Sequence, residues 1–496
     1  MTVETELKLH IAPEHLARLK RHPLLRAHAE GRARTQQLHS IYFDTPDQAL
    51  RRHAMALRLR RAGTRWVQTL KGGGQVSAGL HQRNEWEGPV PSAQLDLAAL
   101  KTLGGKLPRG VHKRLQPVFV TDFTRNMRLL AFEGALIELC IDSGEIRAGE
   151  SVFPISEIEL ELRSGEPQQL FRLALALLDI VPMQVEHTSK AEYGYLLFSA
   201  SRPEASKGRF PVLSPSQDMH SALDSLIASC LAHIQSNIPG ALLKLDEEYL
   251  HQVRVGLRKL RVVLAMAQKL HVDAELEALH RQIADLCTAL GRAREWDVFV
   301  TQTLAPICNR LPEHEGLREV LRASEDARGG LHASVESLLA SSDLQRLLLR
   351  FGAWMHAKRL AAPADPVERF ALRTLDKRHR QVHAAETDLS VGDAQRLHTL
   401  RIACKKLRYA LEMFGSLSQG QCDAYLDSLA DLQDILGVLN DLAVAHRLLN
   451  ELDNAARRDT LALIRGWMER DRAERLAAFR RSWARFVVRK RCWKRH

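Results

Sequence analysis

The segment VETELKL, residues 3–9, alternates polar or charged side chains with apolar ones. Successive side chains of a β-strand point to opposite faces, so Glu4, Glu6 and Lys8 share one face of the predicted strand and the apolar residues occupy the other. We therefore expect a strand with one charged face. This charged face is the feature from which we predict the fold of the first 200 residues.

The same alternation recurs along this part of the chain. It returns in MALRLR (residues 55–60), LIELCID (136–142) and EIELEL (157–162). For one strand, a solvated face of an antiparallel sheet is the simplest interpretation. Two helices, expected around residues 13–21 and 167–179, are too few to cover both faces of so many strands. A closed barrel resolves the problem, with apolar faces packed outward and charges lining a wet interior.

The predicted interior holds two kinds of group. The carboxylates are Glu4, Glu6, Asp142, Glu157 and Glu159, and the cations are Lys8, Arg58, Arg60, Lys71, Arg83, Arg125 and Lys190. Crowded carboxylates are costly to bury without cations, and hard divalent ions suit them, Mg²⁺ first and Mn²⁺ second. Arginine and lysine side chains bind phosphate oxygens. Together, the two groups are typical of phosphoryl chemistry.

The ordered segments resemble the CYTH proteins, the triphosphate tunnel metalloenzymes. The matching segments are ExExK at residues 4–8, IYFDTPD (41–47), ALRLR (56–60), TLKGGG (69–74), HQRNEWE (81–87), TDFTR (121–125), IELCIDSGEI (137–146), EIELEL (157–162) and TSKAEYGY (188–195). The resemblance covers about residues 1–200 and is nearest to bacterial two-domain proteins whose first half is an inorganic triphosphatase. It implies an α+β fold built on an eight-stranded antiparallel barrel, open as a tunnel, that uses Mg²⁺ or Mn²⁺.

The resemblance also implies roles for the interior residues. The five carboxylates would hold the metal, the seven cations would bind the triphosphate, and Glu4, Glu6 and Lys8 would be catalytic. The expected reaction is hydrolysis of inorganic triphosphate to pyrophosphate and phosphate. Thiamine triphosphate, RNA 5′ ends and ATP cyclisation remain alternatives, as does a catalytically weak polyphosphate-binding or targeting protein. A dead tunnel would lack the metal carboxylates, whereas all five are present.

The chain after residue 217 has a helical pattern with an internal repeat. HQVRVGLRKLRVVLAM, from residue 251, aligns with HTLRIACKKLRYALEMF, from residue 398. The repeat predicts two similar helical subdomains related by a pseudo-two-fold axis. Each copy places four basic residues on one helix face, which we call the first basic stripe (His251, Arg254, Arg258, Arg261) and the second basic stripe (His398, Arg401, Lys405, Arg408). A solvated face is the alternative for each stripe, but facing bundles would form one cationic groove.

These two segments resemble the CHAD domain, a helical family that carries HxxRVxxRKxR-like stripes. The resemblance covers about residues 218–490 and implies two four-helix bundles with a basic channel for long-chain inorganic polyphosphate, without catalysis. The expected organisation is a CYTH domain at 1–200, a Pro- and Ser-rich linker at 201–217 and a CHAD domain at 218–490. The net charge of +12 fits polyanionic partners. Nucleic acid is disfavoured, because aromatic residues form only 5% of the chain and no helix-turn-helix or RNP-like motif is present.

The remaining patterns exclude several other classes. The sequence contains no run of about 18 uncharged apolar residues, so no membrane span is predicted. The N-terminus has no apolar signal core. We therefore expect a cytoplasmic protein, with polyphosphate granules as a place of association. KGGG at 71–74 reverses the order of a P-loop, and we predict a hairpin or loop there. Seven singly spaced cysteines predict reduced, mostly buried thiols. The basic tail with Trp483, Phe486 and Trp493 fits either a docked helix or single-stranded nucleic-acid binding. The oligomeric state is not predicted.

Overall fold

The computed structural model describes residues 2–77, 79–199, 203–270, 273–357, 365–385, 393–418 and 420–493. The chain divides into two compact units. We call them the barrel unit (Met1–Lys207, Leu231–Val253 and Ala340–Arg359) and the helical unit (Gly208–Cys230, Arg254–Leu339 and Leu360–His496). Each is described separately.

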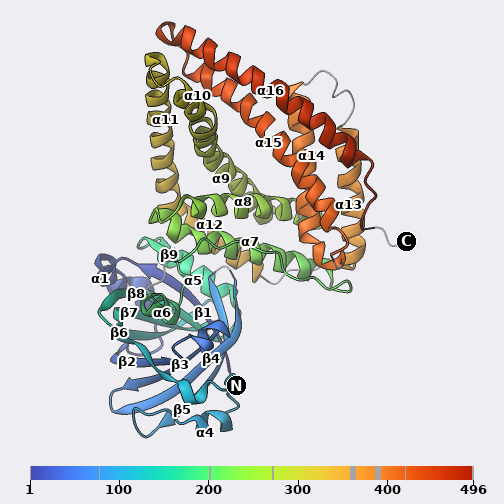
Figure 1. The fold of residues 1–496 in the computed structure, drawn as a ribbon. Coiled ribbons are helices and arrows are strands. Elements are labelled where there is room, and N and C mark those ends of the chain that lie inside the picture. Colours follow the sequence, from blue (N-terminus) through green and yellow to red (C-terminus); the bar gives the residue numbers. More distant parts are fainter. Residues whose placement is uncertain are drawn as a thin grey trace. The chain divides into compact units, whose positions relative to one another are not determined.

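The barrel unit is built on eight antiparallel strands (Figure 1). They are β1 (Thr2–Ile11), β2 (Arg34–Asp44), β3 (Met55–Ala62), β4 (Arg65–Ser77), β5 (Leu80–Val90), β6 (Gln116–Phe132), β7 (Ala135–Ala148) and β8 (Ser151–Ser164). The sheet order is β5-β4-β3-β2-β6-β7-β8-β1, and β1 also pairs with β5, which closes the sheet. A short strand, β9 (Met183–Val185), extends the pairing of β1. The predicted eight-stranded barrel is confirmed.

The alternating pattern places apolar residues outside and charges inside, as predicted. Leu7 and Leu9 of β1 are almost fully buried on the outer face, and the alternating residues Glu6 and Lys8 are almost fully buried on the inner face. Cross-strand partners share a face, and the pairing of Lys8 with Glu159 puts both inside the barrel. Outside, α5 (Gln168–Leu178) packs on β1 and β8 and supplies the apolar cover that the strands require.

One end of the barrel interior is filled by an apolar cluster. The helix α6 (Lys190–Ser199) packs on β6, β7 and β8, and its Tyr195 joins inward-facing Tyr42, Phe119 and Phe123 in this cluster. A side chain at Gly194 would collide with the Phe119 ring at 2.2 Å, so glycine allows the close approach of the helix. The charged residues therefore occupy the part of the barrel interior that this apolar cluster leaves free.

The glycines of KGGG do not form the hairpin or loop predicted from the sequence. They lie within β4, where the pairing with β5 shifts register between Gly72 and Gly74. Gly74 has φ +138°, and a Cβ there would lie 2.1 Å from the Gln82 carbonyl oxygen. The glycines are thus needed for a β-bulge inside the strand, which the local sequence signal does not distinguish from a turn.

The smaller helices of the barrel unit are short connectors. They are α1 (Leu16–Arg21), which follows a 3₁₀ turn at Pro13–His15, α2 (Pro23–Ala27), α3 (Ala49–Arg52) and α4 (Leu97–Thr102). A further helix, α12 (Ser342–Met355), packs on α5 and β9 within the same unit. There Gln345 accepts a hydrogen bond from the Val185 N–H at 2.9 Å.

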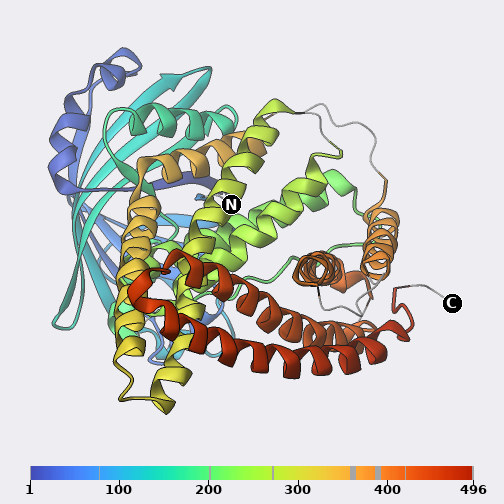
Figure 2. The same cartoon turned by 90° about the horizontal axis from the view of Figure 1, so that it is seen from above.

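The remaining chain is helical, and the predicted all-helical second part is confirmed. The helices are α7 (Met219–Leu242), α8 (Glu247–Ala267), α9 (Ala274–Val298), α10 (Ala305–Arg310), α11 (Glu315–Ala340), α13 (Val367–Ala384), α14 (Ala394–Met413), α15 (Asp423–Glu451) and α16 (Arg458–Val487). Helices α13–α16 share one apolar core, and α15 and α16 run side by side (Figure 2). Trp483, Phe486 and Trp493 are buried in this core, which confirms the docked interpretation of the tail. Among the described residues, no helix is both long and apolar enough to cross a membrane.

The expectation that all cysteines are reduced is wrong. Cys422, just before α15, and Cys492, beyond α16, form a disulfide. The two residues are separated by 70 positions in the sequence, and only the antiparallel return of α16 along α15 brings them together. The other cysteines are free thiols, as predicted.

Candidate functional site

The predicted interior residues line one cavity of the barrel. Its walls include Glu4, Glu6, Lys8, Arg58, Arg60, Lys71, Arg83, Arg125, Glu159 and Lys190. The predicted residues Asp142 and Glu157 lie beside this group and contact Lys190. All but Lys190 come from strands, whose register sets them on the inward face, while Lys190 is the first residue of α6.

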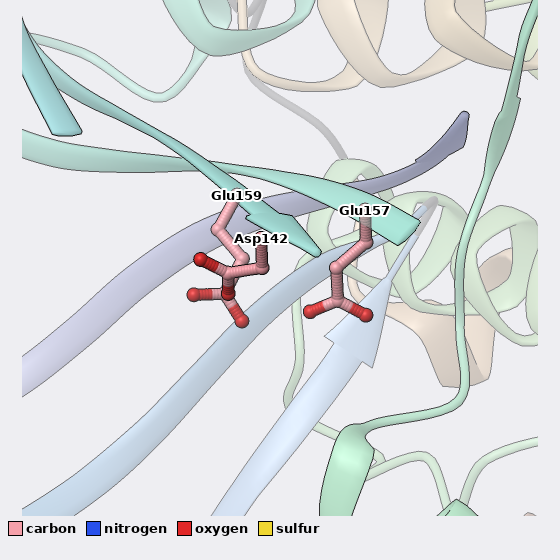
Figure 3. Close-up of side chains that lie close together, drawn as sticks. All are labelled: Asp142, Glu157 and Glu159. Carbon is pink, nitrogen blue, oxygen red and sulfur yellow. The ribbon is translucent and has the colours of Figure 1, made fainter. Parts of the chain in front are cut away.

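Three carboxylates converge beneath the cavity (Figure 3). Asp142 of β7 pairs in register with Glu157 of β8, and Glu159 follows two positions later on the same face. Ligand oxygens of the three lie within 4.8 Å of one another. This spacing matches a group of oxygen donors that can hold one cation.

In this structure a lysine ammonium lies among the three carboxylates. The Lys190 Nζ is 2.7 Å from Asp142 Oδ2 and 3.0 Å from Glu159 Oε1, and it also pairs with Glu157. Burial raises the pKa of Glu157 to about 7 even though Lys190 and Lys8 oppose the shift. By contrast, the charges of Lys190 and Lys8 outweigh burial at Glu159 and hold its pKa well below the usual value. The cluster therefore carries more negative charge than its surroundings fully stabilise.

The other two predicted metal ligands, Glu4 and Glu6, lie outside this three-carboxylate group. Glu6 is 3.2 Å from Lys8, whose ammonium is 2.6 Å from Glu159, so Lys8 lies between the two carboxylates. Burial opposes ionisation of Glu6, but the charges of Lys8 and Lys71 hold its pKa at about 2. Glu4 pairs with Lys71. The five carboxylates thus share one interior but form two groups separated by lysines.

The cations differ in how well they are neutralised. Arg125 donates from Nε and Nη2 to both oxygens of Asp142, at 2.8 and 2.6 Å. Arg58 has Glu85 at 3.8 Å, and its buried Nε has no hydrogen-bond partner among the described residues. Burial disfavours its charge, but Tyr42, Glu85 and Glu4 outweigh burial and raise the pKa of Arg58. Arg60 donates only to the neutral Ser40 hydroxyl, at 3.2 Å. Burial and the charges of Arg58 and Arg125 lower the pKa of Arg60 to about 10. Arg60 is therefore the least neutralised arginine of this wall, and its position suits an anionic ligand.

Sequence reasoning missed several residues of the cavity wall. Tyr42 lines the cavity, and the charges of Arg58 and Arg60 outweigh its burial and lower its pKa. Ser40 shares its face. The signal was available, because both alternate in phase along β2, but their side chains are uncharged and did not stand out.

A second cavity, of about 320 Å³, adjoins the first through Lys71 and Arg83, which line both. Arg51 and Glu192 form an ion pair in its wall. The guanidinium of Arg51 lies 5.5 Å from the centroid of the Tyr195 ring, which is thereby covered on one face. The described lining of this second cavity thus combines basic side chains with apolar ones, among them Met55.

The helical unit brings members of the two basic stripes together. The charge of Arg258, from α8, lowers the pKa of both Arg401 and Lys405, from α14, so these side chains lie near one another. Burial, then the charges of Arg401 and Arg258, lower the pKa of Lys405 to about 7. The buried Nε atoms of Arg258 and Arg401 have no hydrogen-bond partner. The charge of Asp441 opposes both pKa shifts, but one carboxylate does not neutralise three cations, so the cluster favours a further anion.

Other stripe members have neighbours outside this central cluster. Arg254 belongs to its edge, because burial and the charges of Arg258 and Arg294 lower its pKa to about 10. Arg261 lies near Lys406 instead, because burial and the charges of Arg378 and Arg261 lower the pKa of Lys406. His398 contacts Asn440 at 2.8 Å, and Arg408 pairs with Glu412. His251 lies in the stretch of α8 that belongs to the barrel unit.

A closed barrel interior that combines a buried acid cluster with several arginines has the chemistry to accept a phosphate compound and a metal ion. Comparison with known families agrees. Residues 2–195 match the CYTH domain and residues 225–450 match the CHAD domain. The chain therefore carries a CYTH domain followed by a CHAD domain. The CYTH family is metal-dependent, and the Asp142–Glu157–Glu159 cluster can bind a metal.

Two relatives show how the resemblance is distributed. The inorganic triphosphatase of Haemophilus influenzae is 37% identical over 201 residues, which are 40% of this chain and 56% of that protein. The chain thus matches little more than half the length of this relative. An uncharacterized protein of Mycobacterium tuberculosis is 27% identical over 427 residues, covering 81% of this chain and 80% of its own length. The crystal structure of the CHAD domain from the plant Ricinus communis is 29% identical, with a TM-score of 0.48, and covers 58% of this chain and 98% of that one.

Proposed function

We propose that the barrel unit hydrolyses inorganic triphosphate to pyrophosphate and phosphate with a divalent metal ion, and that the helical part binds inorganic polyphosphate. One observation carries the first half. A crowded acid cluster lies in the same closed interior as an arginine wall whose positive charge is incompletely neutralised at Arg60. A linear triphosphate with its metal would neutralise both. The likeness of residues 2–195 to an inorganic triphosphatase supports the same substrate.

The donor set of the interior fits a hard divalent ion, Mg²⁺ first and Mn²⁺ second. Asp142, Glu157 and Glu159 would hold it, with Glu4 and Glu6 completing the acidic side. When bound, such an ion supplies positive charge to phosphate oxygens and lowers the pKa of a coordinated water. Lys190, which occupies this group in the structure, is long enough to turn toward a phosphate instead.

The protein groups do the remaining work in this proposal. Glu6, which stays ionised because of Lys8, or Glu4 would orient the attacking water. Arg58, Arg60 and Arg125 would bind the equatorial oxygens and stabilise charge on the leaving pyrophosphate. Arg58 and Arg60 already line the cavity, whereas Arg125 and Lys190 would exchange a carboxylate partner for a phosphate when the substrate enters.

The likeness to a named relative ranks the candidate substrates. The relative that matches the barrel sequence is an inorganic triphosphatase, which supports triphosphate as the first candidate. The second cavity combines Arg51, Lys71 and Arg83 with apolar residues such as Met55 and does not separate the other candidates. Thiamine triphosphate, RNA 5′ ends and ATP rank below triphosphate on the likeness alone.

Phosphate release by the purified full-length chain tests this proposal. Triphosphate, thiamine triphosphate, ATP and long-chain polyphosphate would be compared with and without Mg²⁺. We expect fast Mg²⁺-dependent release from triphosphate that is lost in Glu4→Gln/Glu6→Gln. Arg61→Ala is the matched control, since Arg61 follows Arg60 but is exposed beside Trp66 outside the barrel. Absence of release from every compound would favour a pure binding protein.

The polyphosphate half of the proposal rests on the cluster of Arg258, Arg401 and Lys405. Their mutual repulsion and unpartnered donors would be relieved by a chain of phosphates. We propose domain boundaries of 1–200 for the catalytic domain and 218–490 for the binding domain, with 201–217 as the linker. Binding would hold the enzyme on polyphosphate granules.

A further inference from the structure

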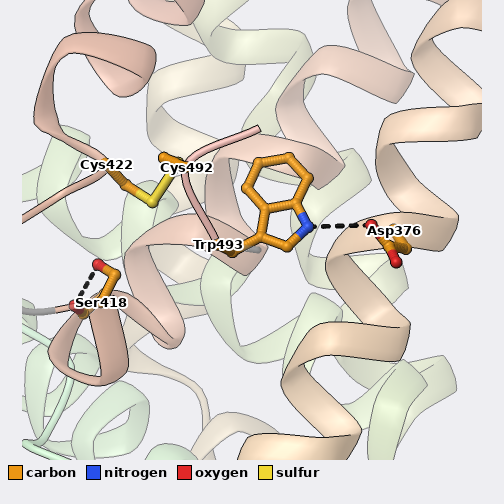
Figure 4. Close-up of a disulfide and its surroundings, with 6 residues drawn as sticks. Asp376, Ser418, Cys422, Cys492 and Trp493 are labelled. Atoms are coloured by element: carbon orange, nitrogen blue, oxygen red, sulfur yellow. Dashed lines mark hydrogen bonds between the residues drawn. A yellow bond between two sulfur atoms is a disulfide. The ribbon is translucent and has the colours of Figure 1, made fainter. Parts of the chain in front are cut away.

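The segment that follows α16 is held in place mainly by side chains. Within the described residues, the backbone of 488–493 bonds only to the last turn of α16, where the Val488 and Arg489 N–H groups donate to the Phe486 carbonyl. The side-chain attachments are the Cys422–Cys492 disulfide, the buried Trp493 ring and the contacts of Asp376 (Figure 4). Asp376 accepts from Trp493 Nε1 at 3.1 Å and pairs with Arg491 at 3.0 Å.

This segment forms part of the wall of a cavity of about 440 Å³ in the helical unit. Cys422, Cys492 and Trp493 line it on one side, and Leu375, Leu411 and Phe414 line it elsewhere. Because both cysteines border the cavity, a small thiol can reach the sulfur atoms without unfolding the bundle. The disulfide thus holds the segment in place and is open to a small thiol from the cavity.

We propose that Cys422–Cys492 is a thiol–disulfide exchange site whose reduction by a dithiol releases residues 488–493 and opens this cavity. The two sulfurs are not equivalent, since Cys422 is 2% exposed and Cys492 is half-buried. The other cysteines are free thiols, so the chain has no general disulfide framework, and this bond stands alone as a reversible one.

The exchange has two steps. A thiolate of the dithiol attacks the more exposed Cys492 sulfur, the bond to Cys422 breaks, and Cys422 leaves as a thiolate that takes a proton from water. The second thiol of the reductant then attacks the mixed disulfide and releases Cys492. The products are two protein thiols and one oxidised dithiol. After this step, the segment keeps its backbone bonds to Phe486, the buried Trp493 ring and the contacts of Asp376.

The test uses the full-length protein, prepared without reductant and then treated with dithiothreitol in native buffer. Peptide mapping after alkylation should show the 422 and 492 peptides linked before treatment and both alkylated after it. Trypsin cleavage after Arg489, Lys490 or Arg491 should become at least about tenfold faster on reduction, because local opening of the segment is no longer opposed by the cross-link.

Two variants complete the design. Cys492→Ser without reductant should match the reduced wild type in its rate of cleavage, and the reduced wild type itself supplies the measurement if this variant folds poorly. Cys404→Ser removes a buried free thiol from the same core and should leave both readouts unchanged. Free thiols at 422 and 492 in the untreated protein, reduction only in denaturant, or equal cleavage rates in the two states would each overturn the proposal.

Discussion

Arg60 shows how a single buried charge can favour function over stability. Its guanidinium is partly buried beside Arg58 and Arg125, and among the described residues it donates a hydrogen bond to the neutral Ser40. The lowered pKa of Arg60 means that the folded barrel holds this charge at a cost. A phosphate ligand would stabilise the charged form of Arg60. Residues with such shifted pKa values are frequent at binding sites.

Replacing Arg60 with methionine should separate the two effects. Triphosphatase activity should fall by about 10²- to 10³-fold, because a preformed donor to the transition state is lost. The melting temperature should stay unchanged or rise, with a gain in the free energy of unfolding of about 1 kcal/mol at most. Steady-state kinetics and thermal unfolding measure both. Arg61→Met, outside the barrel, should change neither, and full activity of Arg60→Met would contradict the assigned role.

Lys405 makes the proposed polyphosphate binding sensitive to pH. Its pKa of about 7 means that it is charged below pH 7 and largely neutral above it. A polyanion favours the charged form, so binding above pH 7 requires uptake of a proton. Affinity should therefore fall as the pH rises from about 7 to 9, by up to about tenfold per unit for this one group. Titration calorimetry in buffers of different ionisation enthalpy measures both the affinity and the proton uptake.

The stability of the helical unit should change with pH in the opposite direction. Between pH 7 and the ordinary lysine pKa, the unfolded chain binds a proton that folded Lys405 lacks, so the free energy of unfolding rises with pH. Lys405→Arg stays charged throughout and should flatten both profiles. A flat affinity profile in the wild type would argue against Lys405 as a ligand group.

At the scale of elements, the acid cluster depends on the meeting of β7, β8 and the start of α6. Register alone sets Asp142 opposite Glu157, and the close packing of α6 at Gly194 brings Lys190 into the same place. A helix thus places a lysine ammonium among three carboxylates. Under the proposed function, a metal ion at this site would have to displace the Lys190 ammonium.

Mn²⁺ or Mg²⁺ should consequently stabilise the barrel unit. An ion at about 100 times its dissociation constant would add about 2.7 kcal/mol to the free energy of unfolding. Glu157→Gln, which preserves shape but removes a ligand charge, should abolish most of the metal-dependent increase in melting temperature. Asp122→Asn, on the outward face of β6 beside His39, is the control and should keep it. An equal increase in both variants would place the ion elsewhere.

At the scale of the whole molecule, the compact units do not follow the order of the sequence. Residues 231–253 and 340–359 belong to the barrel unit although they lie in the helical part of the sequence, after residue 217. The Phe171 ring of α5 meets Gly352 of α12 so closely that a Cβ there would lie 2.0 Å from it. A cut at the end of the barrel sequence would therefore remove part of the barrel unit's packing.

The two proposed functions should nevertheless be separable by substitution. Arg254→Ala/Arg258→Ala/Arg401→Ala/Arg408→Ala should abolish binding of long-chain polyphosphate while leaving triphosphatase activity within about twofold, since none of these residues lines the barrel cavity. Filter binding and phosphate release measure the two. Arg281→Ala, an exposed arginine on α9, is the control for charge loss. Unchanged polyphosphate binding would rule out the groove.

Reduction of the disulfide should affect one unit only. The bond closes a loop of 70 residues, and the chain-entropy model gives such a cross-link about 4 kcal/mol of stability. Calorimetry with and without dithiothreitol should show a lower transition for the helical unit and an unchanged one for the barrel. A shift of both transitions would mean that the units unfold together.

The sequence by itself determined the barrel, its inward charges and the helical second half. Period-two alternation at residues such as Lys8, Arg58 and Glu159 is a local property of strands, and closure follows because both faces must be covered. The internal repeat likewise predicts two equivalent basic stripes. These features depend on neighbours a few residues apart, which a sequence records directly.

Tertiary structure alone decided the pairings between distant segments. It set Lys190 among three carboxylates, separated Glu6 from them by Lys8, joined Cys422 to Cys492 and placed Gly74 in a bulge instead of a turn. Each of these depends on strand register or on the close approach of a helix, which packing of the whole unit determines. Spacing along the chain carries no direct record of such contacts.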